Sequence, residues 1–246
     1  MAFLFLSPST QEYNPYTTYG NEEYWMNLLA DAMIPYLHAS GVNVDRNDPS
    51  GTVGDSVRAS NRGNYDFHLA LHSNASPPNL SGMLQGVTIY YYPGSSRALQ
   101  MANIIADNIR SIYPNPRLVR TVATRALYEL RNTRIPAVLG EFGYHDNLDD
   151  ALWLENNLNT IARSLALSVT EYFGLPFLSP QRPRQAVVQT ISGQLNLRGA
   201  PSVNSQIVTR IPNGTQVSVL NEYNGWYVVE YNNLYGYVLG EYLRFS

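Results

Sequence analysis

Three side chains of this 246-residue sequence combine residue types that can bind a metal ion and move a proton. His72 follows the apolar run 65–71 in the string HLALHSNAS, and Glu141 ends a second apolar run in AVLGEFGYHDN. Glu22 follows Asn21 at the start of a segment with helical periodicity. One histidine with two carboxylates is the donor inventory of hydrolytic zinc sites. The set predicts a hydrolytic centre.

Each of these residues also has a structural explanation when it is taken alone. A carboxylate in the first turn of a helix complements the helix dipole, so Glu22 and its neighbour Glu23 could serve the helix only. Adjacent helical residues point about 100° apart, so only one of the two is expected to reach a shared site. We favour Glu22 and keep Glu23 as the alternative. His72 alone could equally be a structural histidine, and it is the combination that favours chemistry.

The elements that would position these residues alternate between strand and helix along the first part of the chain. Apolar runs predict strands, and apolar residues at helical spacing predict helices. This alternation predicts an α/β fold, a mostly parallel twisted sheet with helices on both faces. In such sheets functional residues lie at the carboxyl ends of the strands, where His72 and Glu141 fall. The expected strands are 2–7, 42–45, 65–71, 87–92 and 135–140, and the expected helices are 21–40, 56–63, 96–113 and 148–173.

The composition changes at residues 175–185, which hold three prolines in PFLSPQRPRQ. Beyond this stretch, short period-2 apolar segments alternate with turn signals such as Asn-Gly, which is typical of a small all-β barrel. The sequence therefore predicts a catalytic domain over 1–175, a Pro-rich linker over 176–185 and a second domain over 186–246.

Composition excludes several classes of function. Charged residues make up 14% of the chain and the net charge is -3, which argues against a nucleic-acid partner. The absence of cysteine excludes disulfides, thiolate metal sites and cysteine nucleophiles. The apolar start of the chain is too short to span a membrane and lacks the positive charges of a secretory signal. We therefore expect no membrane insertion, and release by lysis or by a non-standard export route.

The strings LHSNAS, AVLGE and NEEYWMNLLADAMIPYLHASGVNV occur in the order and rough spacing of one family. Over residues 1 to about 175 the chain resembles the zinc-dependent N-acetylmuramoyl-L-alanine amidases. The resemblance implies hydrolysis of the amide between N-acetylmuramic acid and L-alanine in peptidoglycan. It also implies a Zn²⁺ cofactor held by an early histidine, by Glu22 and by His72, with Glu141 as the catalytic proton shuttle.

The early histidine of that family is missing here. The turn after the first expected strand reads SPSTQE, and no histidine precedes His38. A related branch carries a similar Ser-Pro-Ser-x-Gln string, which favours the amide of Gln11 as the third zinc ligand. Glu12 is the rival, because a carboxylate is the stronger donor. The alternative function is a cell-wall-binding protein whose amidase site has degraded and no longer binds metal.

Other polar residues of the first domain are assigned weaker roles. His68 lies four residues before His72, about 13 Å along the same strand, and is expected to be structural. His145 lies in a loop that could touch substrate. Arg131 and Arg134 flank a polar loop and could meet an anionic stem peptide.

The last part of the chain resembles the bacterial SH3-like family. The strings that carry this resemblance are LNLR, APS, IPNG, GWYV and GYV. It implies a domain that binds peptidoglycan, both glycan strands and stem peptides, with Tyr223, Tyr235 and Tyr242 as candidate contacts. The combination suits a phage endolysin or an exported autolysin.

Overall fold

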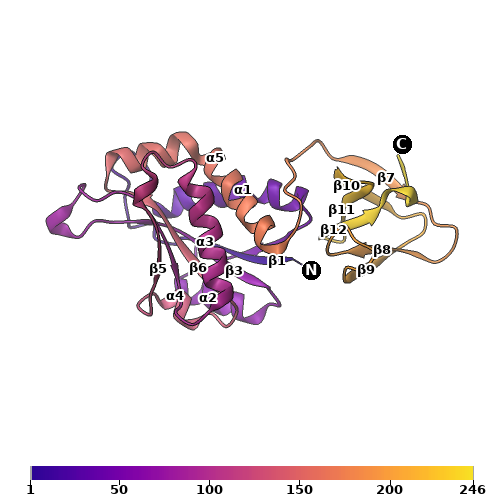
Figure 1. The fold of residues 1–246 in the computed structure, drawn as a ribbon, viewed down its shortest axis with the longest axis horizontal. Coiled ribbons are helices and arrows are strands. Elements are labelled where there is room, and N and C mark those ends of the chain that lie inside the picture. The colour runs from indigo at the N-terminus through magenta and orange to yellow at the C-terminus, as the bar shows by residue number, and fades with distance from the viewer. Residues whose placement is uncertain (1, 246) are drawn as a thin grey trace.

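The computed structural model describes residues 2–245, which form two separate β-sheets (Figure 1). The first sheet has six strands in the order β2-β1-β3-β6-β4-β5, and the second has seven in the order β13-β7-β10-β11-β12-β8-β9. Helices surround the first sheet, whereas the second carries only a single 3₁₀ turn, Gly240–Tyr242.

The strands of the first sheet match the expected ones, with one addition. Their bounds are β1 Phe3–Pro8, β2 Asn43–Arg46, β3 Phe67–Asn74, β4 Val87–Tyr91, β5 Val119–Ala123 and β6 Ala137–Tyr144. The helices are α1 Glu22–Ala39, α2 Val53–Arg62, α3 Ser96–Arg110, α4 Tyr128–Asn132 and α5 Leu148–Phe173, with 3₁₀ turns at Pro78–Leu80 and Pro116–Leu118. The sequence did not predict β5 and α4, because both are five residues long and too short to show a clear period.

Four of the five strand pairs in this sheet are parallel, and only β4 and β6 pair antiparallel. The predicted α/β class, a mostly parallel sheet with helices on both faces, is therefore confirmed. Because β1, β3 and β6 run in the same direction, their carboxyl ends meet at one edge of the sheet.

The two faces of the first sheet differ in character because side chains alternate along each strand. One face presents Leu69 and Leu71 to the large hydrophobic core that includes residues of α1, α3 and α5. The opposite face contributes Ala70 and Leu139 to a small cluster with Leu130 of α4. His68 and His72 alternate with Leu69 and Leu71, so they lie on this second, more polar face.

The N-terminus of α1 is fixed by a side-chain cap. Asn21 has an extended backbone and its Oδ1 accepts a hydrogen bond of 2.8 Å from the Tyr24 amide. The cap satisfies a free helical N–H group, and Glu22 and Glu23 complement the positive end of the helix dipole. The helix therefore begins where Glu22 faces the carboxyl edge of the sheet.

The second sheet is antiparallel throughout and occupies the C-terminal part of the chain. The Asn224-Gly225 turn joins β10 to β11 with both residues at positive φ, as a tight hairpin turn requires. The strands are β7 Arg184–Val188, β8 Gln194–Arg198, β9 Ile207–Pro212, β10 Gln216–Tyr223, β11 Trp226–Tyr231, β12 Leu234–Leu239 and β13 Leu243–Phe245.

The second sheet packs against the C-terminal end of α1 and the start of β2. The Tyr237 hydroxyl donates a buried 2.7 Å hydrogen bond to the Ser40 carbonyl oxygen. Asn43 exchanges two hydrogen bonds of 2.9 Å with the backbone of Tyr235. Tyr237 and Trp226 belong to the same hydrophobic core as α1. The two sheets thus share an apolar interface with buried hydrogen bonds at the end of α1 opposite to Glu22.

This interface changes the interpretation of one predicted wall contact. The Tyr235 ring stacks on the His38 ring with 3.7 Å between centroids and an interplanar angle of 11°. Burial lowers the pKa of His38 to about 4, so the imidazole is neutral in the stack. Tyr235 is therefore occupied by the interface, whereas Tyr223 is exposed.

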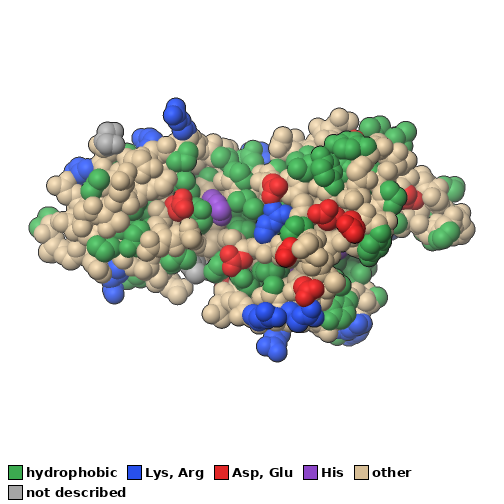
Figure 2. Space-filling model, turned by 180° about the vertical axis from the view of Figure 1, so that it is seen from behind, with side chains coloured by type: hydrophobic (Ala, Val, Ile, Leu, Met, Phe, Trp, Pro, Cys, Tyr) green, Lys and Arg blue, Asp and Glu red, His purple; other side chains and the backbone are tan. Residues whose placement is uncertain are grey.

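The surface fits the low charge of the sequence. On the face shown in Figure 2, the basic side chains, all of them arginine, form no continuous stripe. Across residues 2–245, no helix is long and apolar enough to cross a membrane.

Gly41 provides a test of the interface. It has a φ of +72°, and a Cβ atom there would lie 2.6 Å from Cε2 of Tyr237. Gly174 has a φ of +67° and open space around its Cβ position, so Gly174→Ala is a matched control. We expect Gly174→Ala to lower the free energy of unfolding by about 1–2 kcal/mol through backbone strain alone. Gly41→Ala should lose roughly 1–3 kcal/mol more through the clash.

Urea unfolding followed by tryptophan fluorescence measures both variants. Equal losses in the two variants would show that the Gly41–Tyr237 contact does not constrain the fold.

Candidate active site

A pocket of about 350 Å³ opens at the carboxyl edge of β1, β3 and β6. His72 at the end of β3 and Glu141 on β6 are register partners, so their side chains emerge side by side on the polar face. The turn after β1 and the start of α4 complete the walls. The lining residues are Thr10, Gln11, Tyr13, Gly51, Thr52, Val53, His72, Leu127, Tyr128, Glu129, Leu139 and Glu141.

Three of the predicted residues meet beside this pocket. Nδ1 of His72 lies 2.8 Å from Oε1 of Glu22. Nε2 of Gln11 lies 3.3 Å from that carboxylate oxygen and 3.3 Å from the same imidazole nitrogen. The three polar atoms form a triangle with sides of 2.8, 3.3 and 3.3 Å, a spacing that fits donor atoms around one small cation. The structure therefore brings Gln11, Glu22 and His72 together.

The rival residues lie elsewhere. Glu12 is exposed to solvent and does not line the pocket. Glu23 is only partly buried and accepts a hydrogen bond from Asn27 Nδ2 at 3.2 Å. Glu22, in contrast, is 1% exposed. The 100° rotation between neighbouring helical residues accounts for this difference.

The contact between His72 and Glu22 requires a positive charge, either a proton or a metal ion, at a buried position. An ionised carboxylate only accepts hydrogen bonds, so Nδ1 of His72 must carry a proton or share a cation with Glu22. Burial opposes ionisation of Glu22, yet the bonds from His72 and Asn14 hold its pKa below the usual range. Burial also opposes protonation of His72, yet Glu129 and Glu22 hold its pKa well above the usual range. The site therefore favours a cation at this point.

Glu129 is a further residue of the site that the sequence analysis missed. It lies in the first turn of α4 and is 3% exposed. Its Oε1 accepts from the Ser7 hydroxyl at 2.6 Å and contacts Nε2 of His68 at 2.9 Å, and its Oε2 lies 3.3 Å from Nε2 of His72. Burial opposes ionisation, but the two histidines hold the pKa of Glu129 far below the usual range. The spacing of Leu127 and Leu130 around it was the available signal of a helical turn.

His68 is connected to the site, although the strand spacing suggested a separation of about 13 Å. Nε2 atoms of both His68 and His72 contact the carboxylate of Glu129, because the two side chains lean toward it from one face. His68 is fully buried and its Nδ1 lies 2.9 Å from the Ser60 hydroxyl. It therefore has no access to substrate.

The other predicted contacts do not line the pocket. His145 is buried and its Nδ1 lies 3.2 Å from the Ser73 hydroxyl. Arg131 and Arg134 are exposed and lie outside the pocket lining.

Glu141 lines the pocket with a buried carboxyl group. Its Oε2 is buried and has no hydrogen-bond partner among the residues that the structure describes. Burial, together with the charge of Glu22, raises the pKa of Glu141 to about 7, although His72 opposes the rise. A carboxyl group with a pKa near 7 can both take and release a proton near neutral pH.

The residues present fit a zinc ion. Within residues 2–245 no three His, Asp or Glu side chains surround one point as metal ligands. Here an imidazole and a carboxylate are completed by the amide of Gln11, whose oxygen can take the place of its nitrogen by a 180° turn. That turn brings Nε2 toward the Tyr13 hydroxyl, which can accept as well as donate, and toward Asn14 Nδ2, which is itself a donor. The turn therefore loses the hydrogen bond from Asn14, and a bound cation has to compensate for this loss. Imidazole, carboxylate and amide oxygen are all donors that zinc accepts.

A histidine among carboxylates, at the carboxyl edge of a mostly parallel sheet, defines an α/β protein with a hydrolase-type site. Residues 11–171 match the family model of N-acetylmuramoyl-L-alanine amidases, and residues 193–244 match that of bacterial SH3 domains. The chain belongs to the N-acetylmuramoyl-L-alanine amidase family and carries a bacterial SH3 domain after the amidase domain.

One relative matches a short part of the chain. A Bacillus subtilis (strain 168) protein, YrvJ, described as an N-acetylmuramoyl-L-alanine amidase, is 45% identical over 52 residues, which cover 21% of this chain. The aligned part spans only 10% of that relative.

Solved structures show the same amidase fold. The amidase AmiC2 of Nostoc punctiforme matches with a TM-score of 0.62 and 18% identity, covering 70% of this chain and 97% of that one. The catalytic domain of the CD27L endolysin targeting Clostridia difficile matches with a TM-score of 0.57 and 20% identity, covering 70% and 98%.

The unusual state of Glu141 can be observed directly. In chelator-treated protein, we expect the infrared carbonyl band of the protonated Glu141 carboxyl group to disappear as the pH is raised, with a midpoint near pH 7. The reason is that burial raises the pKa of Glu141 to about 7. Glu141→Gln should lack this transition. A wild-type protein with no carboxylic acid band above pH 6 would contradict the assignment.

Proposed function

We propose that this protein hydrolyses the amide between N-acetylmuramic acid and L-alanine in peptidoglycan, with zinc held by Gln11, Glu22 and His72. Glu141 is the proton shuttle. The observation that carries the proposal is that the Gln11–Glu22–His72 triangle lies beside the pocket that Glu141 lines. Oε2 of Glu141 is buried there and has no hydrogen-bond partner among residues 2–245.

Gln11, Glu22 and His72 would give the zinc ion three protein ligands, which leaves room for substrate. When bound, the zinc ion provides Lewis acidity next to the pocket. Asn14 Nδ2 donates a 2.7 Å hydrogen bond to Oε2 of Glu22, which holds that carboxylate with Oε1 toward His72 and Gln11. The sequence change from histidine to Gln11 retains a donor atom at this position but a weaker one.

Glu141 moves the proton that amide hydrolysis requires. Its ionised form accepts a proton from water as the water oxygen forms its bond to the carbonyl carbon. The protonated carboxyl group then gives this proton to the departing amine nitrogen as the carbon–nitrogen bond breaks. The burial that raises its pKa to about 7 suits both steps.

Exposed apolar side chains stand around the pocket and would hold the substrate. Tyr13, Tyr128 and Val53 are 73%, 45% and 40% exposed, and all three line the opening. Amphipathic aromatic side chains suit contact with sugar rings and peptide backbones.

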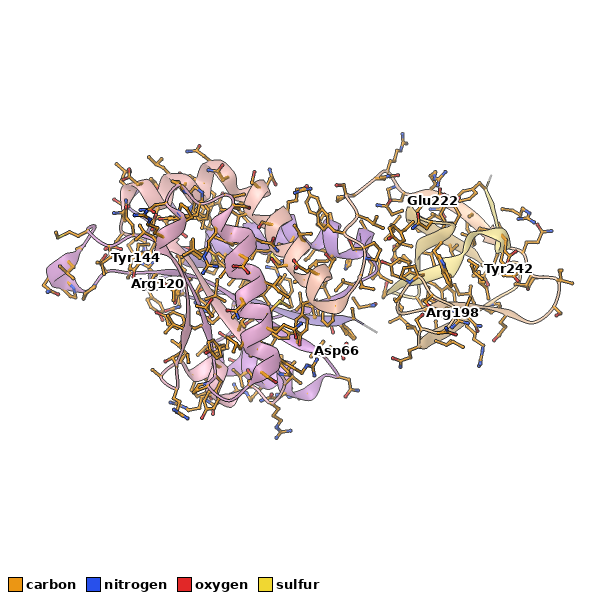
Figure 3. All side chains as sticks on the ribbon, in the orientation of Figure 1. Asp66, Arg120, Tyr144, Arg198, Glu222 and Tyr242 are labelled. Carbon is orange, nitrogen blue, oxygen red and sulfur yellow. The ribbon has the colours of Figure 1, made fainter. Side chains whose placement is uncertain are left out.

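The SH3 domain would bind the cell wall. It has a groove of about 470 Å³ lined by residues that include Trp226, Arg198 and Tyr242, and the last two are labelled on this domain in Figure 3. Wall binding raises the concentration of the enzyme at its substrate. The similarity to an endolysin catalytic domain supports release by phage lysis, and an exported autolysin remains the alternative setting.

The first test replaces Glu141 by Gln. The variant should bind zinc as the wild type does, yet release muropeptides at least about 10²-fold more slowly, because the shuttle is lost. Product analysis should show new L-alanine amino termini and no new reducing ends. Chelator-insensitive release of reducing ends would instead identify a glycosidase, and undiminished activity of the variant would remove Glu141 from the mechanism.

The second test distinguishes the neighbouring glutamates. Glu22→Gln should abolish stoichiometric zinc binding, since it removes the only charged ligand, whereas Glu23→Gln should leave binding unchanged. Metal analysis after dialysis and competition with a chromophoric chelator measure both variants. The wild type without zinc and without activity would identify a wall-binding protein with a degraded site.

A further inference from the structure

Glu129 has an arrangement that the proposed reaction does not use. Its carboxylate is buried, lies on the five-residue helix α4, and has hydrogen-bond partners from β1 and β3. A buried carboxylate is unfavourable unless its oxygens are satisfied. Here Oε1 has two partners, Ser7 and His68, and Oε2 is left for His72.

His68 holds Glu129 from the side away from the pocket. Its Nε2 meets a carboxylate oxygen that can only accept, so this nitrogen carries the proton. Its Nδ1 can then accept from the Ser60 hydroxyl at 2.9 Å. The ring also stacks on Phe5 with centroids 5.3 Å apart. His68 is thus fixed on both nitrogens and on its ring face.

The position of Glu129 determines which ring nitrogen of His72 carries the proton. Oε2 of Glu129 faces Nε2 of His72, which places a proton on Nε2. The lone pair of Nδ1 is then free to face Glu22 and Gln11, the side where a cation would bind. Carboxylates that accept from the second nitrogen of a ligating histidine fix its orientation and raise its basicity.

We propose that Glu129 is a positioning residue that fixes the orientation and tautomer of His72 for zinc binding, and that Ser7 and His68 fix Glu129. This inference rests on the proposed zinc site. Glu129 acts through His72 and leaves proton transfer to Glu141.

The test compares zinc affinities, measured by competition with a chromophoric chelator, in the full chain. Glu129→Gln should weaken zinc binding by about 10–100-fold, the usual effect of losing such a carboxylate. Asp150→Asn is the control. Asp150 is also buried and accepts from the amides of Gly86 and Tyr144, both at 2.9 Å, but does not contact His72. The Asp150→Asn variant should unfold at a lower urea concentration than the wild type and keep the wild-type zinc affinity.

Ser7→Ala is a second variant in case Glu129→Gln does not fold. It removes one donor to Oε1 and should weaken zinc binding in the same direction, by a smaller factor. A folded Glu129→Gln with wild-type zinc affinity, or a Ser7→Ala with wild-type affinity when Glu129→Gln is unfolded, would overturn the positioning role and leave the zinc site standing. A wild type that binds no zinc would overturn both.

Discussion

The His72 imidazole lies between two buried carboxylates, and the rest of the site depends on this contact. Glu22 reaches Nδ1 and Glu129 reaches Nε2. Two negative charges next to one ring would be unstable in the interior unless a cation, a proton or a metal ion, compensates them. α1 has to begin at its Asn21 cap, and α4 has to fold over the sheet, for the two carboxylates to meet the ring. The site thus links elements that are far apart in the chain.

The unequal faces of the first sheet make this burial possible. Three long helices, α1, α3 and α5, contribute to the large core on one face, which therefore contains most of the buried apolar surface of this sheet. The opposite face can then hold histidines and carboxylates, which a uniform apolar core would exclude. The short helices α2 and α4 contact each other on that face, and the pocket opens beside them. The large apolar core and the candidate active site therefore lie on opposite faces of the sheet.

Much of this arrangement could be predicted from sequence because periodicity records which face is buried. His72 lies near the carboxyl end of β3 and is paired in register with Glu141 of β6, so their common edge followed from parallel pairing. Glu22 could be preferred but not chosen with certainty, since the phase of α1 depends on its cap and its packing. Glu129 was missed because a five-residue helix has no period, and its role arises from tertiary contacts with β1 and β3. Long-range hydrogen bonds leave no local pattern in a sequence.

The packed interface between the two sheets has a consequence for the distance between the SH3 domain and the candidate active site. α1 has 18 residues, which at 1.5 Å per residue make a rod of about 27 Å. Glu22 stands at one end of this rod, and the SH3 domain packs at the other through Tyr237. The distance between the SH3 domain and the candidate active site is therefore set by a helix and not by a flexible linker. If both domains act as proposed, an SH3 domain bound to the wall would hold the pocket at a fixed distance. Cleavage of bonds beyond that distance would then require the SH3 domain to dissociate and rebind.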